Sequence, residues 1–185
     1  MSELKRPLTG SQMMKLLPNV KIITYDELPH LGLNDLVSDE RPACIILYMF
    51  AKNYGHYVAL IKKKQYLLFF DSYGLNPDNL RVFKYVPHNV LQQEHETHKY
   101  LSDILSSSDL PVVYNSHRFQ GPGTSTCGRY CAVRIWNSHM NDTEFKDFIY
   151  STVYTPDELV TVLTENVLRN KPYNQMNLIK NNLKK

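Results

Sequence analysis

The sequence predicts a fold that combines a β-sheet with α-helices in one domain. The first indication is a set of short apolar runs, rich in β-branched and aromatic residues, which are typical of strands buried on both faces. The second is a series of helix-like stretches after residue 126, one of them with Pro156 at a favoured first helical position. With 185 residues, 43% of them hydrophobic, the chain has the size of one domain with a sizeable core. We therefore predict a single domain over residues 1–185.

In chain order, the first expected element is a short helix over Thr9–Leu17, which Pro18 ends. Three buried strands should form the centre of the sheet, at Ala43–Met49, Tyr57–Lys62 and Tyr66–Phe70. The polar stretch Asn89–Leu105 fits a surface helix packed mainly at its ends, and Pro111–Asn115 is a candidate further strand. Three helices are expected at the end, over residues 127–138, 143–152 and 156–169.

Charge and cysteine content limit the functional classes. The 21 basic and 18 acidic residues leave a net charge of only +3, so a large electrostatic footprint for nucleic acid is absent. A short tail at about 170–185 is locally basic at Lys180–Lys185. Three cysteines, without an amino-terminal signal segment or a run long enough to span a bilayer, predict a soluble protein with free thiols in a reducing compartment.

The placement of Cys127 is typical of a nucleophile. It follows the Gly/Pro/Ser/Thr-rich turn Gln120–Thr126 and opens the apolar, helix-like stretch Ala132–Trp136. The thiolate is the reactive form of cysteine, and unpaired N–H groups and the positive dipole end at the start of a helix favour this anion. We predict an exposed turn with a reactive thiol at Cys127.

A hairpin upstream would provide a base and its orienting carboxylate. If its turn is centred between Lys63 and Lys64, opposed residues have numbers that sum to 127, and His56 faces Asp71. Lys63-Lys64 is not a favoured hairpin pair, and a slip by one residue would put the two groups on opposite faces. This register is therefore a hypothesis.

These residues fit distinct steps of acyl transfer. Asp71 would hold the imidazole in one tautomer, His56 would take the thiol proton and later protonate the leaving amine, and Cys127 would attack the carbonyl. The backbone N–H of Cys127 and the uncharged side-chain amide of Gln120 are candidate donors to the oxyanion. The chain is thus predicted to be a cysteine hydrolase with catalytic residues His56, Asp71, Cys127 and Gln120.

Simpler interpretations exist for each of these residues. A lone cysteine is more often a small buried hydrophobe, which is our interpretation of Cys44 and Cys131. Cys127 and Cys131 are spaced C-x3-C without a second cysteine pair or a histidine ligand pattern, so no metal site is predicted. Asp71–Gly74 could be only a turn that ends a strand. The remaining histidines lie in polar surroundings and are expected at the surface: His30, His88, His95, His98, His117 and His139.

At these motifs the chain resembles the adenovirus-type endopeptidase family (adenain), within the clan of cysteine proteases that includes SUMO and ubiquitin-like deconjugating enzymes. The resemblance covers most of the chain up to about Trp136. It rests on the order and spacing of Thr24–Asp26, Leu31–Leu33, Pro42–Cys44, Gly55–Tyr57, Leu68–Gly74, Gln120–Pro122 and Cys127–Cys131. It implies an α+β fold in which the catalytic cysteine opens a central helix against a mixed sheet, and the same roles for His56, Asp71, Gln120 and Cys127.

The resemblance also implies substrates. A narrow groove formed by Gly55, Tyr57, Gly121 and Gly123 should admit small residues, in keeping with the clan's preference for glycine beside the scissile bond. The expected function is a cysteine endopeptidase, a monomer without membrane partner, that processes capsid and other virion precursors during particle maturation. Its location would be the virion and the viral factory in the host cytoplasm, or the host nucleus.

The chain departs from the adenovirus enzymes in several places. Tyr57 stands where the family usually has Trp, and Asp71 where those enzymes use Glu. They are activated by DNA and by a disulfide-linked peptide, but Ser107–Pro111, where the linking cysteine is expected, contains none. A DNA or peptide activator is thus an expectation from resemblance alone, and the net charge of +3 suggests at most weak DNA binding. Compact enzymes of virophages and virus-like DNA transposons are more similar.

Two other functions remain open at the level of sequence. A deconjugase that removes a ubiquitin-like modifier would use the same catalytic set together with a surface for a folded modifier. A catalytically silent module associated with the capsid would have no reason to retain all four polar roles.

Overall fold

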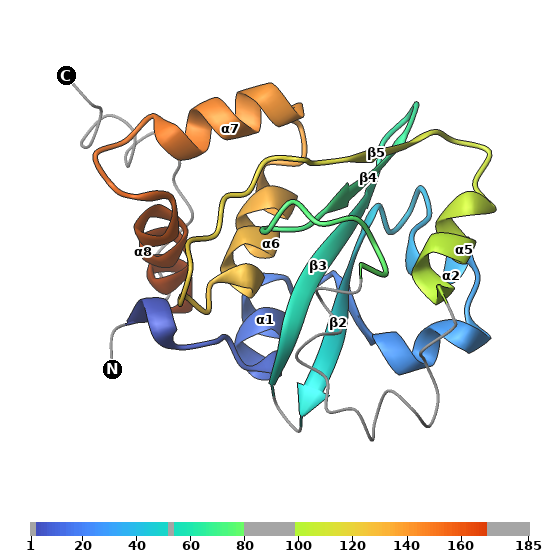
Figure 1. Ribbon diagram of the computed structural model, residues 1–185, viewed down its shortest axis with the longest axis horizontal. Coiled ribbons are helices and arrows are strands. Elements are labelled where there is room, and N and C mark those ends of the chain that lie inside the picture. The colour runs from blue at the N-terminus through green and yellow to red at the C-terminus, as the bar shows by residue number, and fades with distance from the viewer. Residues whose placement is uncertain (1–2, 52–53, 80–98, 170–185) are drawn as a thin grey trace.

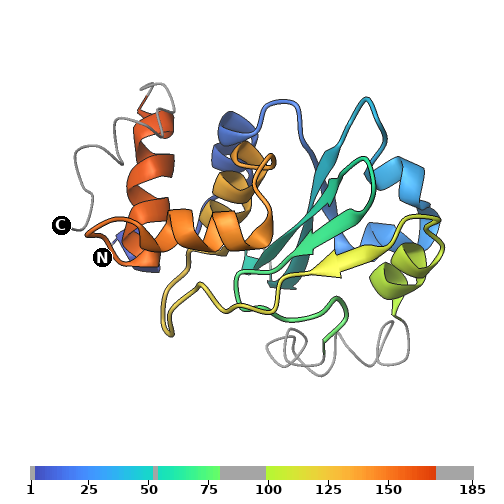
Figure 2. The same ribbon diagram turned by 90° about the horizontal axis from the view of Figure 1, so that it is seen from above.

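The computed structural model describes residues 3–51, 54–79 and 99–169, which form three layers with a sheet in the middle (Figures 1 and 2). The 3-10 helices (η), α-helices and strands are, in chain order, η1 (Glu3–Lys5), α1 (Gly10–Leu16), β1 (Lys21–Thr24), η2 (Tyr25–His30), α2 (Leu33–Leu36), β2 (Ala43–Ala51), β3 (Tyr54–Lys62), β4 (Leu67–Phe70), α5 (Tyr100–Ser106), β5 (Val112–Tyr114), α6 (Cys127–Trp136), α7 (Asp142–Tyr150) and α8 (Pro156–Leu168). Helices α1, α6 and α7 cover one face of the sheet, with α8 packed behind α6, and η2, α2 and α5 cover the other face.

The sheet is mixed and has its strands in the order β1-β2-β3-β4-β5. The central strand β3 is antiparallel to both of its neighbours, β2 and β4, whereas the edge strands β1 and β5 run parallel to their neighbours. Because helices cover both faces, the central strands are apolar on both sides, which explains why they lack an alternating pattern. Ile45 and Ala59 pack toward α6, and Ile46 and Val58 pack toward the opposite layer.

The α+β architecture predicted from the sequence is confirmed, with differences at the ends of elements. β2 continues to Ala51, and β3 begins at Tyr54 rather than at Tyr57. The short strand β1 was not predicted, because a four-residue strand offers too little pattern. The predicted helix Asn89–Leu105 is represented in the described residues by α5, and its residues 89–98 lie outside them.

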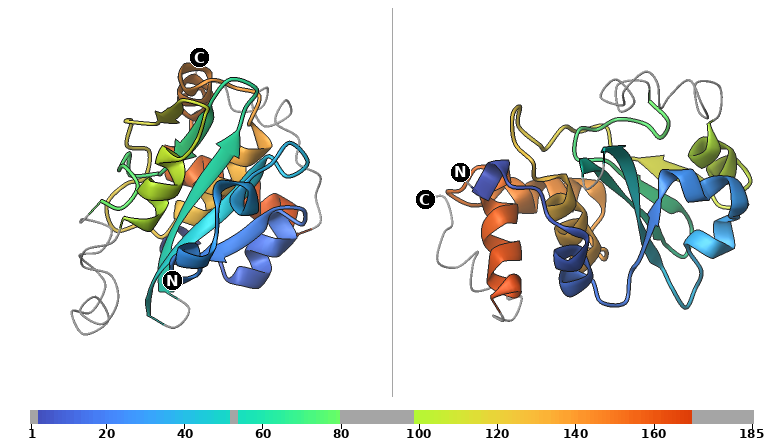
Figure 3. Two further views of the ribbon diagram at one scale, coloured as in Figure 1. Left: turned by 90° about the vertical axis from the view of Figure 1, so that its right-hand side faces the viewer. Right: turned by 90° about the horizontal axis from the view of Figure 1, so that it is seen from below.

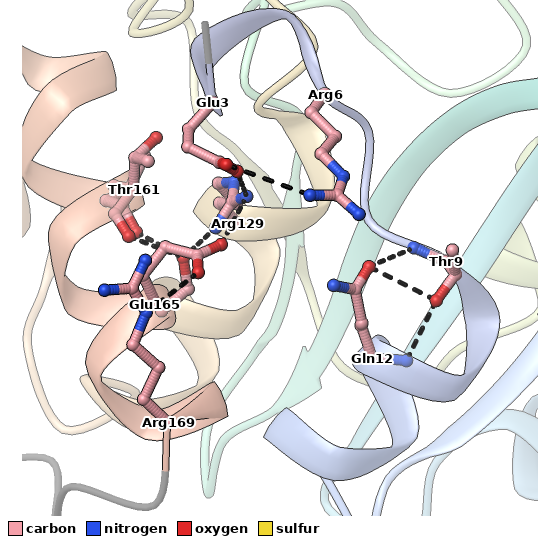
Figure 4. A network of polar contacts seen from close by, with 10 residues as sticks. Glu3, Arg6, Thr9, Gln12, Arg129, Thr161, Glu165 and Arg169 are labelled. Carbon is pink, nitrogen blue, oxygen red and sulfur yellow. Dashed lines mark hydrogen bonds and ion pairs between the residues drawn. The ribbon is translucent and has the colours of Figure 1, made fainter. Parts of the chain in front are cut away.

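Helix α6 lies between the sheet and α8 (Figure 2), and all of its residues from Cys127 to Arg134 are buried. Seen from below, η1 lies beside α8 and α1 beside α6 (Figure 3, right). Buried Arg129 of α6 donates to Glu165 Oε1 on α8 at 2.9 Å (Figure 4). It also donates to Thr164 Oγ1 on α8 at 2.7 Å. A buried charge needs such partners, so these contacts hold α6 against α8.

Side-chain caps define where the surrounding helices begin. Thr9 and Gln12 form a capping box at α1, visible in Figure 4. At α8, Thr155 is the N-cap, Pro156 follows at a first helical position, and Glu158 completes the box. These pairs satisfy backbone N–H groups that the helix itself leaves free, and they fix the position of the first turn.

Candidate active site

Segments far apart in the sequence bring His56, Asp71 and Cys127 together. His56 lies near the start of β3, Asp71 follows directly after β4, and Cys127 is the first residue of α6. His56 Nε2 lies 3.0 Å from Asp71 Oδ2, and both side chains are buried. The His56 side chain lies close enough to the Cys127 thiol for the two groups to alter each other's pKa. Since Nε2 faces the carboxylate, Nδ1 is the nitrogen left for the sulfur.

The register of the hairpin differs from the predicted one. The observed pairs are Ala59 with Phe70, Leu60 with Phe69, Ile61 with Leu68 and Lys62 with Leu67, so that opposed residues have numbers that sum to 129 and not 127. Lys63 N donates to Tyr66 O at 2.9 Å, and the turn is therefore centred after Lys64. A shift of two residues keeps every side chain on its sheet face, whereas a shift of one does not. His56 and Asp71 become diagonal neighbours, which an imidazole can still bridge.

The carboxylate of Asp71 is held from several directions. Its Oδ1 accepts from the backbone N–H of Tyr73 at 2.6 Å. Asn115, which follows β5, accepts from Asp71 N at 2.8 Å and donates to Asp71 O at 2.7 Å. Gly74 N donates to Asp71 O at 2.9 Å, so Asp71–Gly74 is also a turn that ends the strand. Both interpretations of this segment hold, and Asn115 is a support that the sequence did not reveal.

Aromatic and cationic groups cover the imidazole. The ring of Tyr73 stacks on that of His56 with a centroid distance of 5.2 Å. The Arg118 guanidinium in turn lies over the Tyr73 ring, 5.3 Å from its centroid, and Arg118 Nε donates to Gln120 O at 3.1 Å. This stack shields the His56–Asp71 pair from water and strengthens their interaction.

Cys127 lies at the helix start as predicted, but it is 7% exposed and not part of an exposed turn. Burial alone would raise the pKa of the thiol, but the hydrogen bond and charge of His56, with backbone hydrogen bonds from Tyr57 and Gly128, hold that pKa below its ordinary value. For His56, burial alone would lower the pKa, but the charge and hydrogen bond of Asp71 raise it above the ordinary value. The structure therefore favours a thiolate–imidazolium pair.

The other cysteines have a different environment. All three cysteines are free thiols. Burial raises the pKa of Cys44 to about 12. Burial also raises the pKa of Cys131, whose Sγ donates to Tyr57 O at 3.3 Å. Their expected role as core residues agrees with their complete burial.

We expect limiting iodoacetamide to label Cys127 before Cys44 and Cys131, because only the thiolate reacts and only Cys127 has a lowered pKa. Labelling should persist as the pH falls below about 8.5, the ordinary thiol pKa. His56→Ala removes the cation that stabilises the thiolate, and so should shift the pH midpoint of labelling upward. Peptide mapping by mass spectrometry measures both effects, and preferential labelling of Cys44 or Cys131 in the folded protein would contradict the assignment.

Gln120 is oriented by contacts at both ends of its amide. Its Oε1 accepts from Ser72 Oγ at 2.8 Å, and its Nε2 donates to Thr124 O at 2.9 Å. Because a backbone carbonyl only accepts, the atom facing Thr124 has to be the nitrogen. One hydrogen of Nε2 is used in this contact, which leaves the second for a ligand. The side chain is 2% exposed, so its direction is fixed.

The N-terminus of α6 is not closed by its own N-cap residue. Thr126 occupies the N-cap position, but its hydroxyl makes no capping bond and donates instead to Asp157 Oδ1. The first N–H groups of the helix, including that of Cys127, are therefore not occupied by a cap. Such groups can bind an anion.

The four residues predicted to bind substrate differ in how closely other groups surround them. Tyr57 packs against the start of α6, where a Cβ on Gly128 would lie 3.0 Å from its ring. A Cβ on Gly55 would meet Tyr48 O of β2 at 2.4 Å, so strand packing alone requires glycine there. A Cβ on Gly121 would lie 2.9 Å from Asp157 Oδ2, whereas Gly123 has open space and a φ of +73°. Substrate binding by these four residues stays a prediction.

Other candidate groups are separate from this site. Within residues 3–51, 54–79 and 99–169, no group of three or more His, Cys, Asp or Glu side chains could hold a metal ion. His30 and His139 are exposed, as expected. His117 is half-buried and packs on Phe119 and Tyr150, whereas His88, His95 and His98 lie outside the described residues. Among the described helices, none combines the length and apolar character needed to cross a membrane.

No family model matches the chain. Uncharacterized protein V9 of Sputnik virophage is 34% identical to it over 169 residues, which cover 86% of this chain and 95% of V9. The chain belongs to the V9 family. This membership confirms the virophage relationship that the sequence resemblance implied.

Solved structures similar to this V9-family chain have low sequence identity. ChlaDub1 from Chlamydia trachomatis has a TM-score of 0.48 and 13% identity, over 93% of this chain and 96% of ChlaDub1. The SUMO protease Ulp1 has a TM-score of 0.43 and 14% identity, over 89% of this chain and 78% of that one.

Proposed function

We propose that this protein is a cysteine endopeptidase that cuts virion precursor proteins during particle maturation. One observation carries the proposal: Cys127 begins α6 beside a histidine that a buried aspartate holds at 3.0 Å, and that histidine lowers the pKa of the thiol. A nucleophile, a base within reach and a third group that orients the base are the components that acyl transfer requires. Cys44 and Cys131, with raised thiol pKa values, lack this arrangement.

The reaction would proceed through a thioester. The Cys127 sulfur attacks the carbonyl carbon of the peptide bond, and the electron pair of the C=O π bond moves onto the oxygen. The C–N bond then breaks, and His56 gives its proton to the leaving amine. A water molecule, deprotonated by His56, attacks the thioester and releases Cys127 as thiolate.

Two donors would stabilise the negative oxygen of the intermediate. One is the backbone N–H of Cys127, which is the first residue of α6. The other is the remaining N–H of Gln120 Nε2, which Ser72 and Thr124 orient. Donors that are held in place before the reaction contribute most to lowering its barrier. Asp71 would keep the imidazole in the tautomer with Nε2 protonated.

Membership in the V9 family supports a viral context, and hence virion proteins as substrates. The enzyme would act in the virion and in the host cytoplasm or nucleus where particles assemble. Glycine beside the scissile bond would suit the site next to Tyr57 and Gly123. An activating peptide, if one exists, would bind without a disulfide, because Cys44 and Cys131 are fully buried.

The substrate is tested by incubating the purified protein with capsid precursors of the same virus and, separately, with ubiquitin and SUMO fusions. We expect cleavage of an extended precursor segment at or next to glycine, identified by mass spectrometry of the new termini. Cys127→Ala protein is the matched control for contaminating proteases. Efficient release of folded ubiquitin or SUMO, with no cut in any precursor, would favour a deconjugase instead, and no hydrolysis of any substrate would contradict the proposed activity.

A further inference from the structure

Asp157, in the first turn of α8, contacts the turn that carries both candidate oxyanion donors. It lies 37 residues after Gln120 along the chain and is 8% exposed. Its Oδ2 accepts from the backbone N–H of Gly121 at 2.8 Å. Its Oδ1 accepts from the hydroxyl of Thr126 and lies 3.1 Å from the Thr124 hydroxyl. One carboxylate thus holds the turn both directly after Gln120 and directly before Cys127.

These contacts bear on the oxyanion donors in two ways. Gly121 follows Gln120, and Thr124 supplies the carbonyl that orients the Gln120 amide at 2.9 Å. Thr126 is the N-cap of α6, and its hydroxyl, which donates to Asp157, makes no capping bond to the N–H groups of that helix. The absence of a side chain at Gly121 permits this approach, since a Cβ would lie 2.9 Å from Asp157 Oδ2.

Asp157 itself is on a rigid support. It follows Pro156 at the N-terminus of α8, where the Thr155–Glu158 capping box fixes the first turn. A carboxylate in the first turn of a helix is stabilised by the helix dipole. The other end of the loop is tied separately: Phe119 N and Gln120 N donate to Ser72 O at 2.9 and 3.0 Å, and Tyr130 OH donates to Phe119 O at 3.1 Å. Asp157 holds the segment after Gln120, together with a bond from Ser125 N to Leu4 O at 2.7 Å.

We propose that Asp157 is a positioning residue for the oxyanion site, which aligns the Gln120 amide and the Cys127 N–H through its bonds to Gly121, Thr124 and Thr126. This inference rests on the proposed peptidase function and deepens it. The inference assigns two properties of the site, thiolate formation and oxyanion binding, to different sets of residues. The thiolate depends on His56 and Asp71, whereas oxyanion binding also depends on a carboxylate from α8.

Asp157→Asn tests the positioning role of Asp157, because asparagine has nearly the same side-chain shape as aspartate. An amide has one acceptor oxygen, so it cannot serve the Gly121 N–H and the two threonine hydroxyls as the carboxylate does. We expect kcat for peptide cleavage to fall by about tenfold or more with little change in KM, because misplacement of a catalytic group by about 1 Å can cost about 10²-fold. The rate of iodoacetamide labelling of Cys127 should not change, because alkylation forms no oxyanion.

Two further variants distinguish positioning from stability. Thr124→Val removes one hydroxyl contact to Asp157 at a half-buried position and should give a smaller loss of kcat in the same direction. Glu165→Gln is the matched control: it weakens another α8 carboxylate contact to α6, the 2.9 Å pair with Arg129 (Figure 4), away from the oxyanion turn. It should lower the melting temperature but retain kcat.

Binding of a peptide aldehyde that ends in glycinal provides a readout independent of turnover. The sulfur of Cys127 adds to the aldehyde carbon, the π electrons move onto the oxygen, and a proton from His56 completes the hemithioacetal. We expect Asp157→Asn to weaken aldehyde binding by about the factor lost in kcat, and Glu165→Gln to leave it unchanged. Unaltered aldehyde affinity in a folded Asp157→Asn protein, or equal losses of aldehyde binding and alkylation, would overturn the inference. An inactive wild type would instead refute the peptidase proposal, and the aldehyde-to-alkylation ratio would still decide the role of Asp157.

Discussion

Cys127→Ala is expected to abolish peptide cleavage while the protein remains folded. The substitution removes the sulfur that would form the thioester, and the loss in kcat should be on the order of 10⁶-fold, as when other hydrolases lose their nucleophile. Alanine is smaller than cysteine and fits the helix start without strain. The measurements are kcat on a peptide substrate and a thermal unfolding curve followed by circular dichroism.

Cys131→Ala is the matched control for this variant. Cys131 lies one turn further along α6, is fully buried and donates to Tyr57 O. Its replacement should lower the free energy of unfolding by about 1 kcal/mol, the typical cost of a single substitution, and keep kcat within a few-fold. Normal turnover by Cys127→Ala, or loss of turnover only in Cys131→Ala, would identify a different nucleophile.

Gln120→Ala should lower kcat by about 10²–10³-fold with little change in KM, because an oxyanion donor acts chiefly in the transition state. The side chain is 2% exposed and bonded at both ends of its amide, so its N–H direction is set before substrate binds. Steady-state kinetics on the peptide identified in the substrate experiment measure the effect. An increase confined to KM would place Gln120 in ground-state substrate binding.

Gln120→Glu tests the role of the Gln120 side-chain N–H while the volume of the side chain stays nearly the same. A carboxylate can still accept from Ser72 Oγ and occupies nearly the same space, but it offers no N–H to an oxyanion. It should lower kcat at least as much as alanine does, since its charge also opposes the developing negative charge. Activity near that of wild type in the glutamate variant would show that Gln120 only supports the turn.

Local patterns predicted most of the elements and the residues that meet at the site. The central strands are visible because apolar β-branched runs favour strands covered on both faces, and the helix at Cys127 because a Gly- and Thr-rich turn precedes it. The hairpin register was wrong by two residues because the Lys63–Tyr66 turn has no residue pair that specifies a turn type. The predicted His56–Asp71 contact nevertheless formed, since an even shift keeps both side chains on one face.

The supports of the site could not be predicted from the sequence. Asn115 bonds to Asp71 across 44 residues, and Asp157 reaches Gly121 across 36. Such contacts leave no spacing pattern, because they depend on where β5 and α8 pack. Burial of Cys127 was missed for a related reason: the polar residues before it suggested exposure, but Leu8, Met13 and Tyr57 pack around the start of α6.

The place of α8 in the chain order bears on when the proposed activity would arise during synthesis. Arg129, on the helix that Cys127 begins, is 1% exposed, and its side-chain hydrogen bonds go to Thr164 and Glu165 of α8. A buried charge that lacks its partner costs about 3–5 kcal/mol. A nascent chain that has not yet added α8 would contain the hairpin with His56 and Asp71, but Arg129 would keep only its longer, 3.8 Å ion pair with Glu3. The proposed activity would therefore reach its full level only after α8 has been added to the chain and has packed against α6.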